Sequence, residues 1–350
     1  VSSVVRIKTI RQQGEGFGFD LSALNNQNLV NGYSDPGATA NLKYRFNSVD
    51  VFSMLNYWEW DGVDTSHPVQ NTYIMKDGGL TNIFQETYRK GHNSSSGLNA
   101  NMGFNWQLSQ NHSVGARFVM RETVDAGTYY SSITDIIRYD ESSGQVSSVN
   151  ESLQDEKRHS PYDWEGNVYY SGRFGRLGVN FNADYLSNRK DMSCNISDVI
   201  DAGEQVDMFQ EGVTTSRLAA AKLVLTYPVW KGQLEAGAEA TSVERGSSYS
   251  ITNYPLPASD SKVDENNVSA FVSYGFSLPK FGSVSAGLRY EHVGFNYTDL
   301  LDGTNSMDRY QDEFFPSLSW AGQLGPVHAS LSYSLRTSRP GYDDLSDRIK

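Results

Sequence analysis

Strict alternation between apolar and polar residues is the feature that most limits how this chain can fold. It is clearest in the stretch Phe314–Leu345, where the apolar series Val327, Ala329, Leu331, Tyr333, Leu335 alternates with the polar series His328, Ser330, Ser332, Ser334, Arg336. Successive side chains of a β-strand point to opposite faces, so a period of two predicts a strand with one apolar and one polar face. Residues 314–320 run extended into a predicted turn at 322–325, which completes a hairpin.

The same alternation recurs along the whole chain. It predicts about thirteen strands, at residues 17–23, 38–46, 49–60, 98–108, 114–120, 164–174, 177–185, 217–227, 234–240, 268–276, 284–290, 314–320 and 327–335. Short turns are expected near Ser48, Gln110, Gly175, Lys231, Lys280 and Gln323. Long polar segments, predicted as loops, separate them at 61–95, 125–161, 187–214 and 299–312, with 81–92 expected to extend the strand that follows it.

Two regularities predict an all-β, antiparallel, up-and-down transmembrane β-barrel. One face of the predicted strands is too polar for a packed core, so the apolar face is expected to meet lipid and the polar face a wet lumen. Short turns on one side and long loops on the other are typical of the periplasmic and extracellular ends of an outer-membrane barrel. Aromatic residues near strand ends predict the interfacial girdle, namely Tyr57, Trp58, Trp60, Trp106, Tyr227, Trp230, Tyr274 and Trp320.

Composition agrees with this class and excludes others. Hydrophobic residues make up 38% and the mean hydropathy is −0.51, which suits strands that need an apolar residue only at every second position. No apolar run approaches the roughly 18 residues of a transmembrane helix. The net charge of −12 argues against a nucleic-acid partner, and the single cysteine, Cys194, rules out an internal disulfide framework.

The sequence contains no recognisable catalytic motif, so the prediction is that the chain is not an enzyme and has no cofactor. The histidines at 67, 92, 112, 159, 292 and 328 are scattered and are expected to be solvated. Two acidic runs have oxygen ligands at spacings that calcium could use, Asp299, Asp302, Asn305, Asp308 and Asp201, Glu204, Asp207, Glu211. Neither follows the EF-hand order, and solvated surface charge is the preferred interpretation.

The polar residues of the predicted strands are expected to line the lumen. They are Lys43, Arg45, Asn99, Asn101, Asn105, Arg117, Arg121, Asn180, Asn182, Arg289, His328 and Arg336. Hydrogen bonding to water or to a plug explains any one of them, and the sequence names no ligand-binding residue.

Five runs of residues resemble a known family. The runs 314–319, 329–334 and 338–345, together with 234–237 and 285–291, are similar to the outer-membrane-protein β-barrel branch of the TonB-dependent receptors. The resemblance implies a 22-stranded barrel with an N-terminal plug inside it, and Val4–Ile10 resembles the last strand of such a plug. It therefore implies the end of a plug at residues 1–13 and a barrel domain at 14–350, incomplete at its C-terminus. A competing count takes 4–10 as a barrel strand and gives a complete 14-stranded barrel.

The resemblance implies an outer-membrane receptor that imports a scarce nutrient, such as a siderophore, haem, a peptide or a glycan. Expected partners are outer-membrane lipid and lipopolysaccharide, a small-molecule or peptide ligand, and a TonB-type energy-coupling protein that contacts a segment preceding this sequence. The alternative is a surface adhesin or a passive pore, since the long polar segments 61–95 and 125–161 could also meet another protein.

Overall fold

The computed structural model describes residues 15–76, 79–140, 144–279, 281–324 and 326–337. The predicted end of a plug, residues 1–13, lies outside the described residues, as does the segment 338–345 used for the family resemblance. No helix in the described part of the chain is long and apolar enough to span a membrane.

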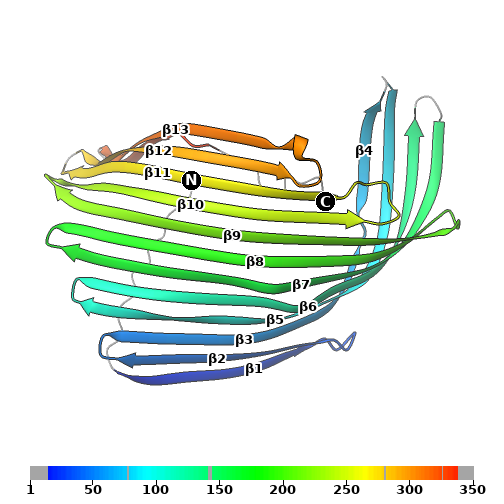
Figure 1. Ribbon diagram of the computed structural model, residues 1–350, viewed down its shortest axis with the longest axis horizontal. Helices are drawn as coiled ribbons and strands as arrows, with labels where there is room; N and C mark the ends of the chain where they lie inside the picture. The colour runs from blue at the N-terminus through cyan, green and yellow to red at the C-terminus, as the bar shows by residue number, and fades with distance from the viewer. Residues whose placement is uncertain (1–14, 77–78, 141–143, 280, 325, 338–350) are drawn as a thin grey trace.

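The described residues form one antiparallel sheet of fourteen strands (Figure 1). Each strand pairs with its neighbours in sequence except β4, which lies off the main path and pairs only with β5. The strands are β1 (Gly16–Gln27), β2 (Ser34–Phe46), β3 (Val49–Ser66), β4 (Val69–Lys76), β5 (Gly79–Ser109), β6 (His112–Asp140), β7 (Gly144–Phe174), β8 (Leu177–Ile200), β9 (Gln205–Val229), β10 (Gly232–Ile251), β11 (Ser259–Leu278), β12 (Gly282–Asp299), β13 (Met307–Leu324) and β14 (Val327–Ser334), with a 3₁₀ turn η1 (Gly303–Asn305) before β13.

All thirteen predicted strands are confirmed, and the register confirms their two faces. Leu42 of β2 lies opposite Ser53, while the next residue, Lys43, lies opposite Phe52. Following such pairs across the sheet places the apolar series of every predicted strand on one face, called here the apolar face. The predicted lumenal residues that lie within strands fall on the other, the polar face.

The girdle prediction is wrong for Trp58 and Trp60. Trp58 pairs with Gly97, which shares a face with Asn99, so both tryptophans belong to the polar face. Strand-end position alone does not fix the face of a side chain, because the face depends on parity within the strand.

The short turns lie where they were predicted, with one exception. Asn47 (φ 49°) and Gly175 (φ 61°) adopt the left-handed backbone that two-residue hairpin turns require. The exception is the predicted turn at 322–325. Gly322 and Gln323 instead continue β13 and pair with Ala329 and His328 of β14, which ends at Ser334.

The prediction of long loops is wrong for three of the four segments, whereas 299–312 contains a loop at 300–306 before β13 begins at Met307. Residues 61–95 lie mostly in β3, β4 and β5, residues 125–161 in β6 and β7, and residues 187–214 in β8 and β9. At about 3.3 Å per residue, the 31 residues of β5 or β7 reach about 100 Å, whereas about 9–11 residues cross a bilayer. The expected extension of a strand at 81–92 is confirmed by β5. The first three predicted loops are therefore continuations of the sheet well beyond membrane thickness.

Four register irregularities mark one level of the sheet. They fall between Ser96 and Gly97 in the β5–β6 pair, between 120 and 123 and again between 123 and 126 in β6–β7, and between 159 and 162 in β7–β8. A bulge adds a residue to one strand and bends it. Figure 1 shows the distal parts of β4, β5, β6 and β7 turning away from the other strands beyond this level.

Within the described residues the sheet is open. β1 pairs only with β2, and β14 only with β13. The main path contains thirteen strands, and the fourteenth, β4, belongs to a hairpin beside it. The alternative of a complete 14-stranded barrel depended on residues 4–10, which lie outside the described residues, and β4 does not replace them. The predicted total of 22 strands stays a prediction.

Glycines on the polar face leave room for aromatic rings from neighbouring strands. A Cβ built on Gly103 would lie 2.4 Å from the carbonyl oxygen of Ala116 and 2.7 Å from Cζ of Phe52. A Cβ built on Gly97 would lie 2.7 Å from both the carbonyl oxygen of Glu122 and Cζ2 of Trp58. Real Cβ atoms do not come this close to non-bonded atoms, so a side chain at either position displaces the ring or the paired backbone. Gly166 on the apolar face differs, because nothing lies within 4 Å of its Cβ position.

We predict that Gly103→Val destabilises the protein by about 1–3 kcal/mol, the usual cost of overpacking. The matched substitution Gly166→Val on β7 adds the same side chain into open space and is expected to be nearly neutral. Urea unfolding in detergent micelles, followed by tryptophan fluorescence, measures both. Equal effects of the two substitutions would contradict the proposed packing of Phe52 on Gly103.

Candidate functional site

A large hollow lies on the polar face at the level of the bulges. It has a volume of about 990 Å³ and draws residues from seven strands. We call it the bulge hollow. It is lined by Trp58, Ser95, Asn99, Arg121, Glu122, Thr123, Ala126, Arg158, His159, Ser160, Asp163, Asn188, Lys190, Asp191, Met192, Gly212, Thr214, Ser216, Arg245 and Tyr249.

The bulges help to build this hollow. Thr123 and His159 each border a register irregularity, Ser95 lies one residue from another, and all three line the hollow. Between this level and the short turns the register shifts only at Gln107/Ser109, next to a turn, so polar side chains alternate at even spacing along most of each strand. Bulges commonly re-aim side chains and are over-represented beside functional sites. The hollow is therefore placed by the backbone geometry of β5 to β8.

One row of residues crosses the hollow from strand to strand. Asp163 of β7 lies opposite Asn188 of β8, which lies opposite Ser216 of β9, which lies opposite Arg245 of β10. Arg121 of β6 continues the row, with Nη1 3.6 Å from Oδ1 of Asp163. The row thus has a guanidinium group at each end and polar side chains between.

Arg121 is held by two carboxylates of β7. Besides Asp163, its Nη2 donates to Oε2 of Glu165 at 3.2 Å. A guanidinium group has five N–H donors, so these contacts leave others available to a ligand. Arg158 forms an ion pair with Glu156, and Nε of Arg189 donates to Oδ1 of Asp191 at 2.8 Å.

Several of the remaining predicted lumenal residues bond to other side chains of the protein. Nε of Arg117 donates to Asn101 at 2.9 Å, Tyr169 donates to Asn105 at 2.8 Å, and Ser171 donates to Asn180 at 2.8 Å. Arg289 connects Glu239, 3.4 Å away, with Glu291 on its own strand. Only Asn99 and Arg121 of the predicted set line the bulge hollow, and Arg336 lies just beyond β14.

Sequence reasoning missed most of the hollow. Arg158, Lys190 and Arg245 fall outside the strands that alternation predicted, and Trp58 was assigned to the girdle. The available signal was β-propensity, because residues 127–137 are rich in Thr, Tyr and Ile. The β-propensity of this segment predicts that β6 continues through the predicted loop. With β6 extended, the residues of the neighbouring strand could have been assigned to the polar or the apolar face.

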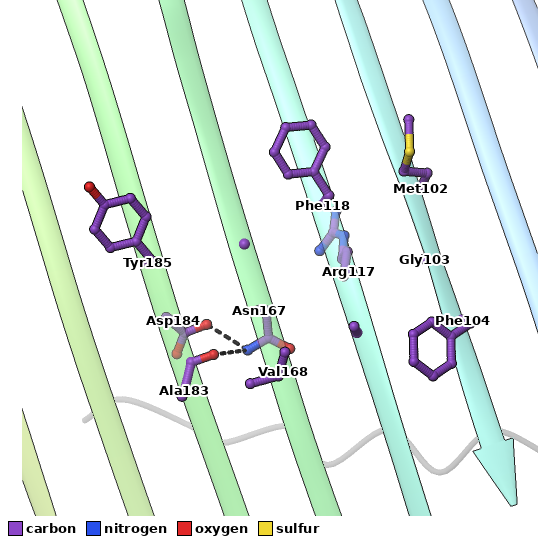
Figure 2. Close-up of a pocket in the computed structure, with 12 residues that line it drawn as sticks. Met102, Gly103, Phe104, Arg117, Phe118, Asn167, Val168, Ala183, Asp184 and Tyr185 are labelled. Atoms are coloured by element: carbon purple, nitrogen blue, oxygen red, sulfur yellow. Dashed lines mark hydrogen bonds between the residues drawn. The ribbon is translucent and has the colours of Figure 1, made fainter.

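A second hollow lies on the apolar face, across β5, β6, β7 and β8 (Figure 2). Its volume is about 490 Å³, and its apolar lining is Met102, Phe104, Ala116, Phe118, Val168, Ala183 and Tyr185 around the bare surface of Gly166. Gly103, Arg117, Asn167 and Asp184 also line it, but the register places them on the polar face, where Nδ2 of Asn167 donates to Oδ1 of Asp184 at 2.6 Å. This hollow suits hydrocarbon and offers no polar recognition.

Carboxylates of the acidic runs accept hydrogen bonds from other groups of the protein in the described structure. Oδ1 of Asp302 accepts from the backbone N–H and the hydroxyl of Thr304, and these bonds lower the pKa of Asp302. Asp299 accepts from two backbone N–H groups, and Asp201 accepts from the backbone N–H of Val149. Asp207, Glu211 and Asp308 of the same runs accept from the side chains of Ser197, Ser250 and Asn296. These carboxylates are thus engaged by groups of the protein, and three or more possible metal ligands do not gather anywhere in the described residues.

The histidines at 67, 159, 292 and 328 are exposed, as predicted, but three histidines of the chain also lie beside a carboxylate. His67 lies 2.7 Å from Glu86, His292 lies 2.8 Å from Asp312, and His92 contacts Asp61. Each pair joins residues far apart in sequence that the register brings side by side. No short motif could have revealed them.

The comparisons with known proteins fit this architecture. The model of the outer membrane protein beta-barrel family matches residues 174–349, half of the chain. The chain belongs to this family. It is an outer-membrane protein whose strands cross the membrane, with the apolar face toward lipid. No curated protein matches the sequence.

Several solved structures are similar to the chain at low identity. They include the outer membrane protease OmpT of Escherichia coli (12% identity, covering 80% of this chain and 96% of that one, TM-score 0.26) and the toluene transporter TodX of Pseudomonas putida (11%, 90% and 84%, 0.30). A third is BauA, the ferric preacinetobactin receptor of Acinetobacter baumannii (10%, 91% and 61%, 0.23). TM-scores of this size carry no assignment of activity.

The prediction that the chain is not an enzyme is corrected by this comparison, since OmpT is a protease. The prediction rested on the lack of short catalytic motifs. In a sheet of this kind, acid–base pairs form across strands, as His92 and Asp61 do, and leave no such motif. The exclusion of enzymes from the sequence therefore does not stand, and the low TM-score assigns no protease activity either.

Cys194 lies beyond the membrane-spanning part of β8 and is 3% exposed. Burial, and next the carboxylate of Glu156 on the paired strand, raise the pKa of the thiol to about 11. The thiolate is the reactive form, so the folded protein holds this thiol in its inert state near neutral pH.

We predict that iodoacetamide modifies Cys194 at pH 8 about a hundredfold more slowly than an ordinary thiol, because the pKa is raised by about two units. The double variant Cys194→Ser, Asn195→Cys moves the thiol to an exposed neighbour and is expected to react at the ordinary rate. Mass spectrometry measures both rates, with urea-unfolded protein as reference. Fast modification of folded wild-type protein would contradict the burial of Cys194.

Proposed function

We propose that this chain is part of an outer-membrane receptor that imports a scarce nutrient, in the manner of the TonB-dependent receptors that its sequence resembles. The observation that carries the proposal is the position of the bulge hollow. It lies on the polar face, toward the side of the long hairpins and away from the short turns. If the short turns are periplasmic, a solute arriving from outside meets this hollow before it reaches the membrane-spanning part of the lumen.

The partners follow from the same arrangement. The apolar face and the aromatic side chains at its borders would contact lipid, and the extended strands above them would contact lipopolysaccharide. A TonB-type energy-coupling protein would act through a plug, of which residues 1–13 would be the end. The ligand would be a siderophore, haem, a peptide or a glycan.

We predict that nutrient uptake through the natural gene product depends on energy coupling. A strain lacking the gene is complemented with the wild-type gene or with one lacking its TonB-contact segment, and growth is followed on ferric siderophores, haemin, peptides and glycans. At least one supplement is expected to support growth only with the intact gene, and a protonophore is expected to abolish its uptake. Uptake that is unchanged by the deletion would contradict the proposal.

A second candidate, an adhesin, is favoured by the exposed apolar side chains of the long hairpins. Tyr73 of β4, Tyr88 of β5 and Ile133 of β6 are all exposed, and β5 brings them onto one surface. Exposed apolar surface of this kind marks interaction sites. Deleting β4 with its turn would abolish adhesion and leave uptake intact. A passive pore would show open-channel conductance in planar bilayers, whereas a plugged receptor is expected to be nearly silent.

A further inference from the structure

The bulge hollow gathers four basic side chains in a chain whose net charge is −12. Arg121, Arg158, Lys190 and Arg245 come from β6, β7, β8 and β10, so the hollow is surrounded by cations from four different strands. The same lining also contains three carboxylates, Glu122, Asp163 and Asp191, and His159. What the hollow can bind depends on which of these charges reach solvent.

The basic partners of the ion pairs are the more exposed ones. The side chain of Arg121 is 46% exposed and that of Asp163 only 22%. The side chain of Arg158 is 65% exposed and that of Glu156 only 16%. The carboxylates are thus less accessible than the guanidinium groups, which keep N–H donors accessible to a solute. The surface that a ligand meets is richer in donors than the count of charges suggests.

Lys190 adds a charge that is not engaged in an ion pair. It is exposed and lies opposite Thr214 in the β8–β9 pair, and no ion pair involves it within the part of the chain that the structure describes. The nearest carboxylate along the strand, that of Asp191, is bonded to Arg189. The ammonium group of Lys190 is therefore available to a solute without breaking a contact of the protein.

We propose that the bulge hollow binds a multiply charged anion, a solute with two or more carboxylate or phosphate groups. Guanidinium groups bind such groups through paired, charge-assisted hydrogen bonds, and lysine binds them as a point charge. Asn188 and Ser216 lie between Arg121 and Arg245 and supply neutral donors. A volume of about 990 Å³ admits a solute of small-molecule size.

This inference specifies the ligand class of the receptor proposed above, and its role in import rests on that proposal. The binding of the anion to the hollow does not depend on the import proposal. The carboxylate and phosphate forms of the anion share one recognition chemistry, and a neutral oligosaccharide, which the hydroxyl-rich lining also admits, is the competing class.

The test is isothermal titration calorimetry on the purified chain in detergent micelles, with citrate, pyrophosphate and, as the neutral probe, maltotriose. Citrate or pyrophosphate is expected to bind with an affinity that falls as salt rises, and maltotriose is expected not to bind. Lys190→Gln is expected to weaken anion binding about tenfold, through the loss of one charge-assisted contact. The control is Lys157→Gln, an exposed lysine of β7 next to Arg158 that does not line the hollow, and it is expected to leave binding unchanged.

Each outcome decides the question. No anion binding, equal effects of Lys190→Gln and Lys157→Gln, or preferential binding of maltotriose would overturn the inference. Because Lys190 is exposed and unpaired within the described residues, its substitution tests binding without testing folding, and urea unfolding of the variant checks this. Anion binding without energy-dependent uptake would overturn the import proposal and leave this inference intact. Uptake of a neutral nutrient without anion binding would overturn this inference and leave the import proposal intact.

Discussion

The backbone hydrogen-bond ladder between neighbouring strands is the constraint on which everything else in this protein depends. Lipid offers no partner for an N–H or C=O group, so strands that cross a membrane must satisfy one another. Here that pairing does not stop at membrane thickness. β6 and β7 remain paired from His112 and Gly172, near the short turns, to Asp140 and Gly144 at the far end of their hairpin, interrupted only at the bulges. The ladder thus carries the lumenal surface well beyond the bilayer and makes the extended hairpins part of the same sheet.

The alternation in the sequence depends on the two faces of a strand having different environments, not on the pairing of the strand. This difference explains which strands could be predicted from the sequence. Ala38 to Phe46 alternates cleanly because one face of β2 meets lipid and the other meets water. Above the membrane both faces are wet, so Thr128 or Ser131 is acceptable on either, and the alternation disappears while the ladder continues. The membrane-spanning strands were therefore predictable to within a few residues. The extended hairpins were mistaken for loops because both of their faces are wet, and such strands show no alternation in their sequence.

The candidate site was hidden for the same reason. Asn99 and Arg121 lie at the edge of the alternating region and could be placed on the polar face from the sequence. Arg158, Lys190 and Arg245 lie beyond it, where parity gives no guide until the register is known. The bulges add a second obstacle, because an extra residue in one strand reverses the parity of all residues beyond it. Trp58 shows how a single parity assignment decides between lipid and lumen.

The bulges also explain why a hollow forms at this level and not lower in the sheet. In the regular part, side chains of the polar face satisfy one another across adjacent strands, as Arg117 does with Asn101, and Phe52 covers Gly103. At the bulges the strands bend apart in direction, and such cross-strand pairs no longer cover the surface completely. The charged groups there must be stabilised along their own strand or one strand away, as Arg158 is by Glu156 and Arg121 by Glu165. Short-range pairing of this kind anchors each guanidinium group and leaves part of it exposed. In the regular part of the sheet, the side chains of the polar face bond to one another. At the bulges the irregular backbone leaves some of these side chains able to bind a solute.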